Sequence, residues 1–274
     1  MSALPVTLTV PVWAEAGRSA DPAQPVLVFL HGIGGGKQGF ASQLAYFAQA
    51  GWRALAWDMP GYGQSAALNP VDFPALADAL LRMLDAAGIR RAVLIGHSMG
   101  GMVAQQAWTL CPERIAGLVI AASSPAFGHS TGEFQKQFVA QRLAPLDAGK
   151  TMAEVAQALI PTMVAPAYQG PGFALAWDCM SAVPCATYRA SIQALVTFEQ
   201  RAALPTITVP TLCLAAEYDT TAPPEVMRRM AEKIPGAVFE VLADAGHLLC
   251  FEQPDRFNTV IDHFLKKQGL DRAE

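Results

Sequence analysis

One serine lies in a setting that points directly to chemistry. The segment Gly96-His97-Ser98-Met99-Gly100 has the pattern G-x-S-x-G and lies between an apolar run and a helical pattern. A tight strand-to-helix turn projects such a serine above the sheet edge, and its small neighbours avoid Cβ clashes. The N–H groups that begin the following helix would favour negative charge beside it. These features predict that Ser98 is a nucleophile, and the alternative is a glycine-rich turn with a solvated serine.

A serine hydroxyl becomes a strong nucleophile only beside an oriented base. His247 follows the predicted strand Ala237–Leu242, which suits the chain order serine, acid, histidine. Of the other four histidines, His97 adjoins the serine and His31 opens a glycine-rich loop. His263 lies in a predicted helix, and His129 has no assignable role. We expect the His97 side chain to point away from the pocket. His247 is therefore the predicted base.

The acid that orients this base should follow a strand between the serine and the histidine. Asp219 comes shortly after the predicted strand Thr211–Ala216. Its role would be to hold His247 in the productive tautomer and to stabilise the imidazolium. Asp244, three residues before His247, is the main alternative and Glu217 is a lesser one.

An acyl-transfer site also needs two N–H donors for the oxyanion. The amide of Met99, directly after the nucleophile, is one candidate. The other is the amide of Ile33 in the loop His31-Gly-Ile-Gly-Gly-Gly36, with Gly34 in reserve. This loop lacks the G-x-x-x-x-G-K-[ST] pattern of a phosphate cradle, because Gln38 follows Lys37.

The elements around these residues alternate between short apolar runs and helical patterns, which predicts a mostly parallel, doubly wound sheet. The first stretch, Val6–Glu15, alternates weakly and predicts an antiparallel edge pair around Pro11. The predicted buried strands are Val26–Leu30, Trp52–Trp57, Ala92–Ile95, Gly117–Ala122, Thr211–Ala216 and Ala237–Leu242. The predicted helices that accompany them are Phe40–Ala50, Val71–Ala87, Met99–Leu110, Pro224–Ile234 and Pro254–Lys267.

This alternation stops in the middle of the chain. Between about Pro125 and Ala203 only helical patterns occur: Gly132–Leu143, Thr151–Met163, Phe173–Met180 and Tyr188–Arg201. We therefore expect an α/β core formed by residues 1–124 and 204–274, with residues 125–203 inserted as a helical cap.

Composition excludes several classes of partner. The 274 residues carry a net charge of −4, and no cluster of Lys and Arg exceeds a pair, so we expect no binding to nucleic acid or to an anionic membrane. No apolar run approaches the ~18 residues that span a bilayer, and the start has no basic region of a signal peptide. The five cysteines contain no CxxC pair, which predicts a cytoplasmic protein without disulfides or zinc.

Five segments together resemble the α/β-hydrolase fold with a helical cap. They are His31-Gly-Ile-Gly-Gly35, Asp58–Ser65, Gly96–Gly101, Pro210–Asp219 and Ala245–Leu248. The resemblance implies an enzyme with a Ser98, Asp219, His247 triad and no metal or organic cofactor. The segments around Asp219 and His247 are also similar to 3-oxoadipate enol-lactonases, which implies hydrolysis of a small carboxylic ester or lactone through an acyl-enzyme.

Several alternatives stay open within this fold. A serine nucleophile argues against the dehalogenase and epoxide-hydrolase branches, which use aspartate. Carbon–carbon hydrolases of ring-cleavage products usually carry asparagine where this chain has His97. Cofactor-free haloperoxidases share the same triad, and some proteins of the fold are ligand receptors.

The cap is expected to form the roof of the substrate pocket. Its apolar residues suggest a largely apolar substrate, with Arg142 and Arg189 as anchors if that substrate carries a carboxylate. The predicted pocket residues are Gly34, Phe127, Met163, Trp177, Met180 and Leu248.

Overall fold

The strands of the protein form one sheet of seven. The computed structural model describes residues 9–18, 23–127 and 132–271. In chain order the strands are β1 (Trp13–Ala16), β2 (Val26–Leu30), β3 (Ala54–Trp57), β4 (Ala92–His97), β5 (Ile115–Ala121), β6 (Thr211–Ala216) and β7 (Val238–Leu242). Their spatial order is β1-β3-β2-β4-β5-β6-β7, and every pair except β1 with β3 is parallel. This architecture confirms the predicted α/β class.

The amino-terminal edge differs from the expected strand pair. In the described residues, the stretch contributes the single strand β1, whose Trp13 pairs with Trp57 of β3. Pro11 precedes it, and a proline has no N–H for a ladder hydrogen bond, so the strand begins after it. Residues 6–8 of the expected pair lie outside the described part of the chain.

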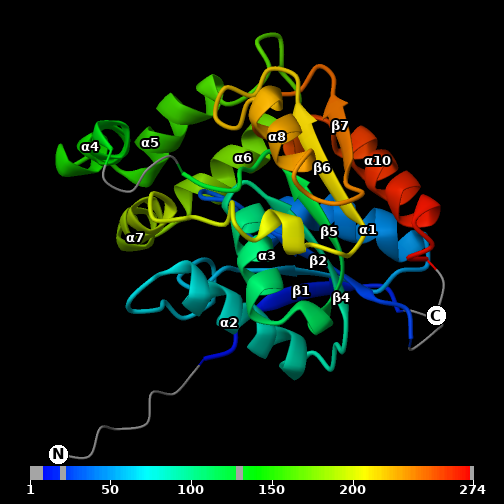
Figure 1. Ribbon diagram of the computed structural model, residues 1–274. Helices are drawn as coiled ribbons and strands as arrows, with labels where there is room; N and C mark the ends of the chain where they lie inside the picture. The colour runs from blue at the N-terminus through cyan, green and yellow to red at the C-terminus, as the bar shows by residue number, and fades with distance from the viewer. Residues whose placement is uncertain (1–8, 19–22, 128–131, 272–274) are drawn as a thin grey trace, which may run out of the picture.

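Helices cover both faces of the sheet, because the inner strands are apolar on both sides. In β2, Val26, Val28 and Leu30 belong to one apolar cluster, while Leu27 and Phe29 belong to the other. The first cluster is covered by α2 (Phe73–Ala86), α3 (Met99–Leu110) and α8 (Pro224–Ala231), and the second by α1 (Ala41–Gln49) and α10 (Pro254–Lys267). Figure 1 shows α1 and α10 side by side on one face of the sheet.

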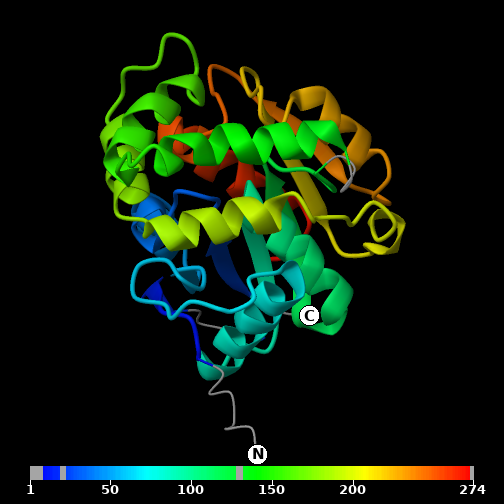
Figure 2. The same ribbon diagram turned by 90° about the vertical axis from the view of Figure 1, so that its left-hand side faces the viewer.

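Four further helices follow β5 and precede β6 along the chain, and they gather on one side of the molecule (Figure 1). They are α4 (Glu133–Asp147), α5 (Met152–Leu159), α6 (Gly172–Ser181) and α7 (Cys185–Leu195). In Figure 2, α4 and α7 run beside each other across the side that faces the viewer. The described part of this segment contains no strand beyond an isolated bridge between Ala126 and Glu199.

The last of these helices corrects one prediction. The expected helix Tyr188–Arg201 begins three residues earlier, directly after Pro184, and ends at Leu195. The chain cannot stay helical beyond that point because it pairs with the segment that enters the four helices. The Phe127 amide donates to the Phe198 carbonyl at 3.0 Å, and the Gln200 amide donates to the Pro125 carbonyl at 2.8 Å. Entry and exit of the helical segment therefore lie side by side.

Close packing at the turn after β4 requires glycine at position 100. A Cβ there would lie 2.0 Å from the carbonyl oxygen of Leu30, because α3 starts directly against the end of β2. We expect Gly100→Ala to lower the free energy of unfolding by about 3 kcal/mol, since backbone must move to relieve the overlap. Urea unfolding measures this loss.

Gly88→Ala is the matched control for this prediction. Gly88 has φ +66°, but a Cβ at this position would meet no atom within 4 Å, so its substitution should cost only the ~1 kcal/mol of a left-handed conformation. Equal losses for the two variants would contradict the packing explanation.

Candidate active site

Ser98 occupies a strained turn between β4 and α3. Its backbone angles are φ 53° and ψ −119°, a region that residues other than glycine rarely adopt. Two hydrogen bonds hold the turn: the Ser98 amide donates to the Ala121 carbonyl at 2.9 Å, and the Ser123 hydroxyl donates to the Ser98 carbonyl at 2.7 Å. The turn therefore presents the Ser98 side chain at the end of the central strands, as its glycine spacing predicts.

The structure brings Ser98, His247 and Asp219 together in one hydrogen-bonded chain. His247 Nε2 lies 3.0 Å from Ser98 Oγ, and His247 Nδ1 lies 2.8 Å from Asp219 Oδ2. With its Nδ1–H donating to the carboxylate, the imidazole presents an unprotonated Nε2 to the serine hydroxyl. The three residues come from the turns that follow β4, β7 and β6, which end at the same edge of the sheet.

The Asp219 carboxylate is buried yet kept ionised. Its other oxygen accepts from the amides of Thr221 and Ala222, at 2.7 and 2.9 Å. Burial favours the neutral acid, but the interaction with His247 and these two amides outweighs it and lowers the pKa of Asp219 below its ordinary value. A charged carboxylate thus faces the histidine.

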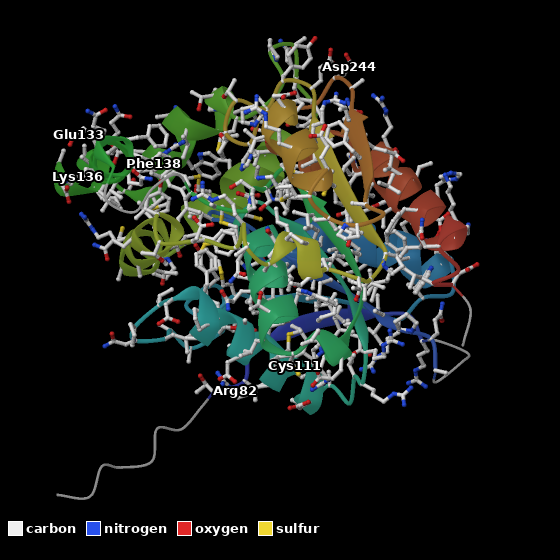
Figure 3. The ribbon with its side chains drawn as sticks, in the orientation of Figure 1. Arg82, Cys111, Glu133, Lys136, Phe138 and Asp244 are labelled. Carbon is white, nitrogen blue, oxygen red and sulfur yellow. The ribbon has the colours of Figure 1, made fainter. Side chains whose placement is uncertain are left out.

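The two alternative acids have other partners. The Asp244 side chain is 75% exposed, lies 3.7 Å from the Arg256 guanidinium, and stands at the outer rim of the molecule in Figure 3. Glu217 accepts the Asp244 amide at 2.9 Å and so shapes the loop that carries His247. Within the described part of the chain, neither carboxylate forms a hydrogen bond or an ion pair with the His247 ring.

The glycine-rich loop after β2 packs directly against the serine. A Cβ at Gly32 would lie 2.8 Å from Ser98 Cβ, so only glycine permits this approach. His31 fixes the loop, because its Nδ1–H donates to the Gly32 carbonyl at 2.8 Å and its Nε2 accepts the Met59 amide at 3.0 Å. Burial lowers the pKa of His31 to about 4, so this arrangement persists at neutral pH.

The two expected oxyanion donors, the amides of Ile33 and Met99, adjoin Gly32 and Ser98 in the sequence. Ile33 lines the same cavity as Ser98, and Met99 is the first residue of α3. Neither amide appears among the backbone hydrogen bonds of turns, loops and helix ends in the described residues. Both N–H groups are thus available to a ligand.

His97 has a contact that the sequence reasoning missed. We expected its side chain to point away from the pocket, yet it lines the cavity and its Nε2–H donates to the His247 carbonyl at 2.7 Å. The strained turn after β4 directs the His97 ring toward the loop that follows β7. Burial, with the nearby His247, lowers the pKa of His97 to about 3, so the ring stays neutral.

Burial of neutral His31 and His97 predicts loss of stability in acid. The unfolded chain binds each proton near pH 6.5, whereas the folded chain resists it until about pH 4 and about pH 3. Unfolding therefore takes up protons below about pH 6.5, and the free energy of unfolding should fall as pH is lowered, by about 1.4 kcal/mol per pH unit for each histidine. Urea unfolding between pH 7 and pH 4.5 measures this slope.

His97→Gln tests the assignment, because glutamine keeps a donor but does not titrate. We expect the slope of the free energy of unfolding against pH to decrease by about 1.4 kcal/mol per pH unit, the contribution of one proton. His263→Gln, at an exposed site on α10, should leave the slope unchanged. Identical slopes in wild type and His97→Gln would refute a buried neutral His97.

Glu252 is a second residue without a recognised signal in the sequence. It lies in the short helix α9 (Leu249–Glu252) and is only 6% exposed. Its carboxylate accepts the Gly246 amide at 3.0 and 3.1 Å and the Ala165 amide at 2.7 Å. Burial raises the pKa of Glu252 above its ordinary value. Glu252 thereby joins the loop of His247 to the segment between α5 and α6.

A small cavity, which we call the inner cavity, opens beside Ser98. Its volume is about 60 Å³. Besides Ser98 and His247, its wall includes Phe138 and Arg142 of α4, Leu159 of α5, Met180 of α6, and Tyr188 and Ile192 of α7. The helices between β5 and β6 therefore supply most of the wall opposite the serine.

The predicted pocket residues divide between this cavity and other places. Three of them, all apolar side chains, line the inner cavity: Met163, Met180 and Leu248. Gly34 lines an adjoining hollow of about 20 Å³.

Two of the predicted residues line neither space. Phe127 lies behind the wall, with its ring 4.7 Å from that of Phe138. Trp177 is half-buried on α6, one turn before Met180, and packs against the apolar core. Apolar character alone does not distinguish a residue that lines the cavity from one that packs in the core.

The described residues contain no group of three or more side chains that could hold a metal ion. None of the helices in the described ranges is both long and apolar enough to cross a membrane.

Comparison with known proteins places this geometry in a family. Residues 25–254 match the family described as alpha/beta hydrolase fold. A protein from Stutzerimonas stutzeri named as a carbamate hydrolase, RutD, is 33% identical over 91% of this chain and 95% of its own length. A 2-hydroxy-6-oxononadienedioate/2-hydroxy-6-oxononatrienedioate hydrolase from Pseudomonas sp is 28% identical over 90% of each chain. The enol-lactonase from Burkholderia xenovorans LB400 superposes with a TM-score of 0.82 at 23% identity, over 93% of this chain and 96% of that one.

Proposed function

Because the chain belongs to the α/β-hydrolase fold family, we propose that this hydrolase cleaves a small carboxylic ester or lactone through an acyl-enzyme at Ser98. The observation that carries the proposal is the hydrogen-bonded chain from Ser98 Oγ through His247 to Asp219. It supplies a nucleophile, a base and an orienting carboxylate in contact with one another.

In the first half of the reaction, His247 Nε2 takes the proton as Ser98 Oγ attacks the carbonyl carbon. The amides of Met99 and Ile33 then donate to the oxyanion, and Asp219 stabilises the imidazolium. As the tetrahedral intermediate collapses, His247 gives its proton to the leaving alkoxide. The product is an acyl-enzyme and a free alcohol, or an opened lactone that stays attached.

In the second half, water replaces the alcohol in the same position. His247 takes a proton from that water as it attacks the acyl carbonyl, and then protonates Ser98 Oγ as the acid leaves. No step requires a metal or an organic cofactor.

Ester chemistry fits the groups that surround Ser98. Among the described residues, His247 is the one titratable side chain hydrogen-bonded to the serine, and His97 is neutral and turned to a backbone carbonyl. One histidine suffices to protonate a leaving alkoxide. The apolar wall of Ile33, Met163, Met180 and Leu248 suits a small apolar acyl or ring substrate.

We further propose that residues 1–124 and 204–274 act as the catalytic core, with residues 125–203 as a cap over the site. The paired entry and exit of this segment and its contribution to the inner cavity support that division. Glu252, which bonds to both Gly246 and Ala165, would hold cap and catalytic loop together.

One observation favours a second candidate, hydrolysis of a carbamate. The relative named as a carbamate hydrolase spans nearly the whole chain at 33% identity. A carbamate carbonyl would be attacked by the same serine, but its leaving group can be an amine instead of an alcohol. The two candidates therefore differ in the bond that breaks and not in the nucleophile.

A panel of substrates tests the proposal. Purified protein is assayed with short-chain methyl esters, δ- and γ-lactones, N-alkyl carbamates and a vinylogous 1,5-diketone. We expect kcat/KM to be highest for an ester or lactone. A higher value for a carbamate would favour the second candidate, and one for the diketone would favour carbon–carbon cleavage. A protein that binds these ligands without turnover, and whose Ser98 does not react with a fluorophosphonate, would be a receptor.

A further inference from the structure

Two polar side chains in the wall of the inner cavity have no hydrogen-bond or ion-pair partner among the described residues. Neither the Arg142 guanidinium nor the Tyr188 hydroxyl forms an ion pair or a hydrogen bond within the described part of the chain. Tyr188 as a whole is only 1% exposed, and it lines the cavity. Both groups can donate hydrogen bonds, so a ligand atom that lies between them in the cavity can accept from each.

The two side chains face each other from neighbouring helices. Arg142 is on α4 and Tyr188 is on α7, and the positive charge of Arg142 acts on the phenol group of Tyr188. The guanidinium carbon of Arg142 lies 5.2 Å from the ring centre of Phe138, one turn earlier on α4. In Figure 3, Phe138 lies on the inner side of α4, whereas Glu133 and Lys136 lie on the outer side. The stacked position of Arg142 fixes its fork on the inner side of the helix.

Arg142 and Tyr188 also border a second space, here called the outer hollow. It has a volume of about 650 Å³, lies between α4, α5 and α7, and shares Arg142, Leu159 and Tyr188 with the inner cavity. The two polar groups therefore stand at the junction between the space beside Ser98 and an open approach from solvent.

We propose that Arg142 and Tyr188 form a subsite for a carboxylate carried by the ester or lactone substrate. This inference rests on the function proposed above and narrows its substrate class. The planar fork of Arg142 can donate two parallel hydrogen bonds to a carboxylate, and the Tyr188 hydroxyl can donate a third. The apolar part of the substrate would fill the inner cavity and place its carbonyl at Ser98.

The surroundings favour an anion at this junction. The outer hollow keeps one side of the carboxylate in contact with water, which limits the cost of its desolvation. The neighbouring cations are already neutralised: Lys150 pairs with Glu154 at 2.8 Å, and Arg189 pairs with Asp147 at 2.5 Å. Arg142 is thus the cation that remains for a ligand in this wall, within the described residues.

Paired substrates test the subsite. Monomethyl esters of succinic, glutaric, adipic and pimelic acid are compared with methyl esters in which a methyl group replaces the free carboxylate. In wild type we expect kcat/KM to favour the carboxylate member of at least one pair. Arg142→Gln should reduce this preference about tenfold to hundredfold, mainly through KM, and Tyr188→Phe should reduce it severalfold. Arg142→Lys should restore part of it.

Arg189→Gln is the matched control, because it removes a cation of α7 that is already paired and does not line the cavity. It should leave the preference unchanged. The proposal is overturned if Arg142→Gln lowers both members of every pair by the same factor, or if wild type shows no preference in any pair.

A binding measurement separates this proposal from the proposed function. Calorimetry compares monomethyl adipate binding to Ser98→Ala and to Ser98→Ala with Arg142→Gln. At least tenfold weaker binding to the double variant supports the subsite, even if wild type hydrolyses no ester. Equal affinities refute the subsite while leaving ester hydrolysis at Ser98 unaffected.

Discussion

Replacing Ser98 by alanine is expected to abolish hydrolysis of the best substrate, with a loss in kcat of about 10⁶-fold. The alanine removes the hydroxyl oxygen that lies 3.0 Å from His247 Nε2, so no acyl-enzyme can form. The proposed oxyanion donors, the amides of Met99 and Ile33, remain, so we expect a small residual rate through direct attack of water. Initial rates with that substrate, measured at high enzyme concentration, give the factor.

The fold should survive this change. Alanine adopts φ 53° no more easily than serine does, so the free energy of unfolding should stay within about 1 kcal/mol. Ser124→Ala is a suitable control, because Ser124 Oγ donates to the Ala126 carbonyl and does not contact His247. It should retain both activity and labelling by a fluorophosphonate. Undiminished turnover by Ser98→Ala would disprove nucleophilic catalysis at this residue.

Asp219→Asn should have the second largest effect, a loss in kcat of about 10⁴-fold at neutral pH. An asparagine at this position can present an N–H to His247 Nδ1 in place of the carboxylate that now accepts from it at 2.8 Å. The proton of the imidazole then resides on Nε2, so this nitrogen cannot accept the Ser98 proton. The imidazolium also loses a negative charge beside it. Steady-state rates of wild type and variant, at the same pH, measure the loss.

Asp244→Asn is the matched control. It is the same chemical change three residues before His247, at a side chain 75% exposed to solvent. We expect activity within about twofold of wild type, since exposed ion pairs contribute little. If instead Asp244→Asn were inactive and Asp219→Asn active, the orienting carboxylate would have been assigned to the wrong residue.

The sequence was most informative where local rules act. The run Val26–Leu30 is apolar at every position, which is typical of a strand covered on both faces, and it forms β2. Gly96, Ser98 and Gly100 lie at a spacing that suits one kind of turn, because a Cβ at Gly100 would overlap the Leu30 carbonyl. The order of Ser98, Asp219 and His247 along the chain could likewise be predicted, because each follows a parallel strand and such strands end at one edge.

Prediction was weaker where contacts join distant segments. The helix expected over Tyr188–Arg201 ends at Leu195, because its continuation pairs with the chain near Ala126. That pairing depends on a residue more than seventy positions away, and the periodicity of the local sequence does not depend on such a distant contact.

Local pattern and backbone chemistry by themselves thus determined the α/β class, the strained serine turn and the choice of the three interacting side chains. Only the tertiary structure decided which residues between β5 and β6 face Ser98, because an apolar side chain such as Phe127 and one such as Met180 differ in neighbours and not in type. The same holds for charge. Arg142 and Arg189 are alike in the sequence, yet packing gives Arg189 the partner Asp147 and leaves Arg142 facing the cavity, since the course of α4 and α7 sets which side chains meet.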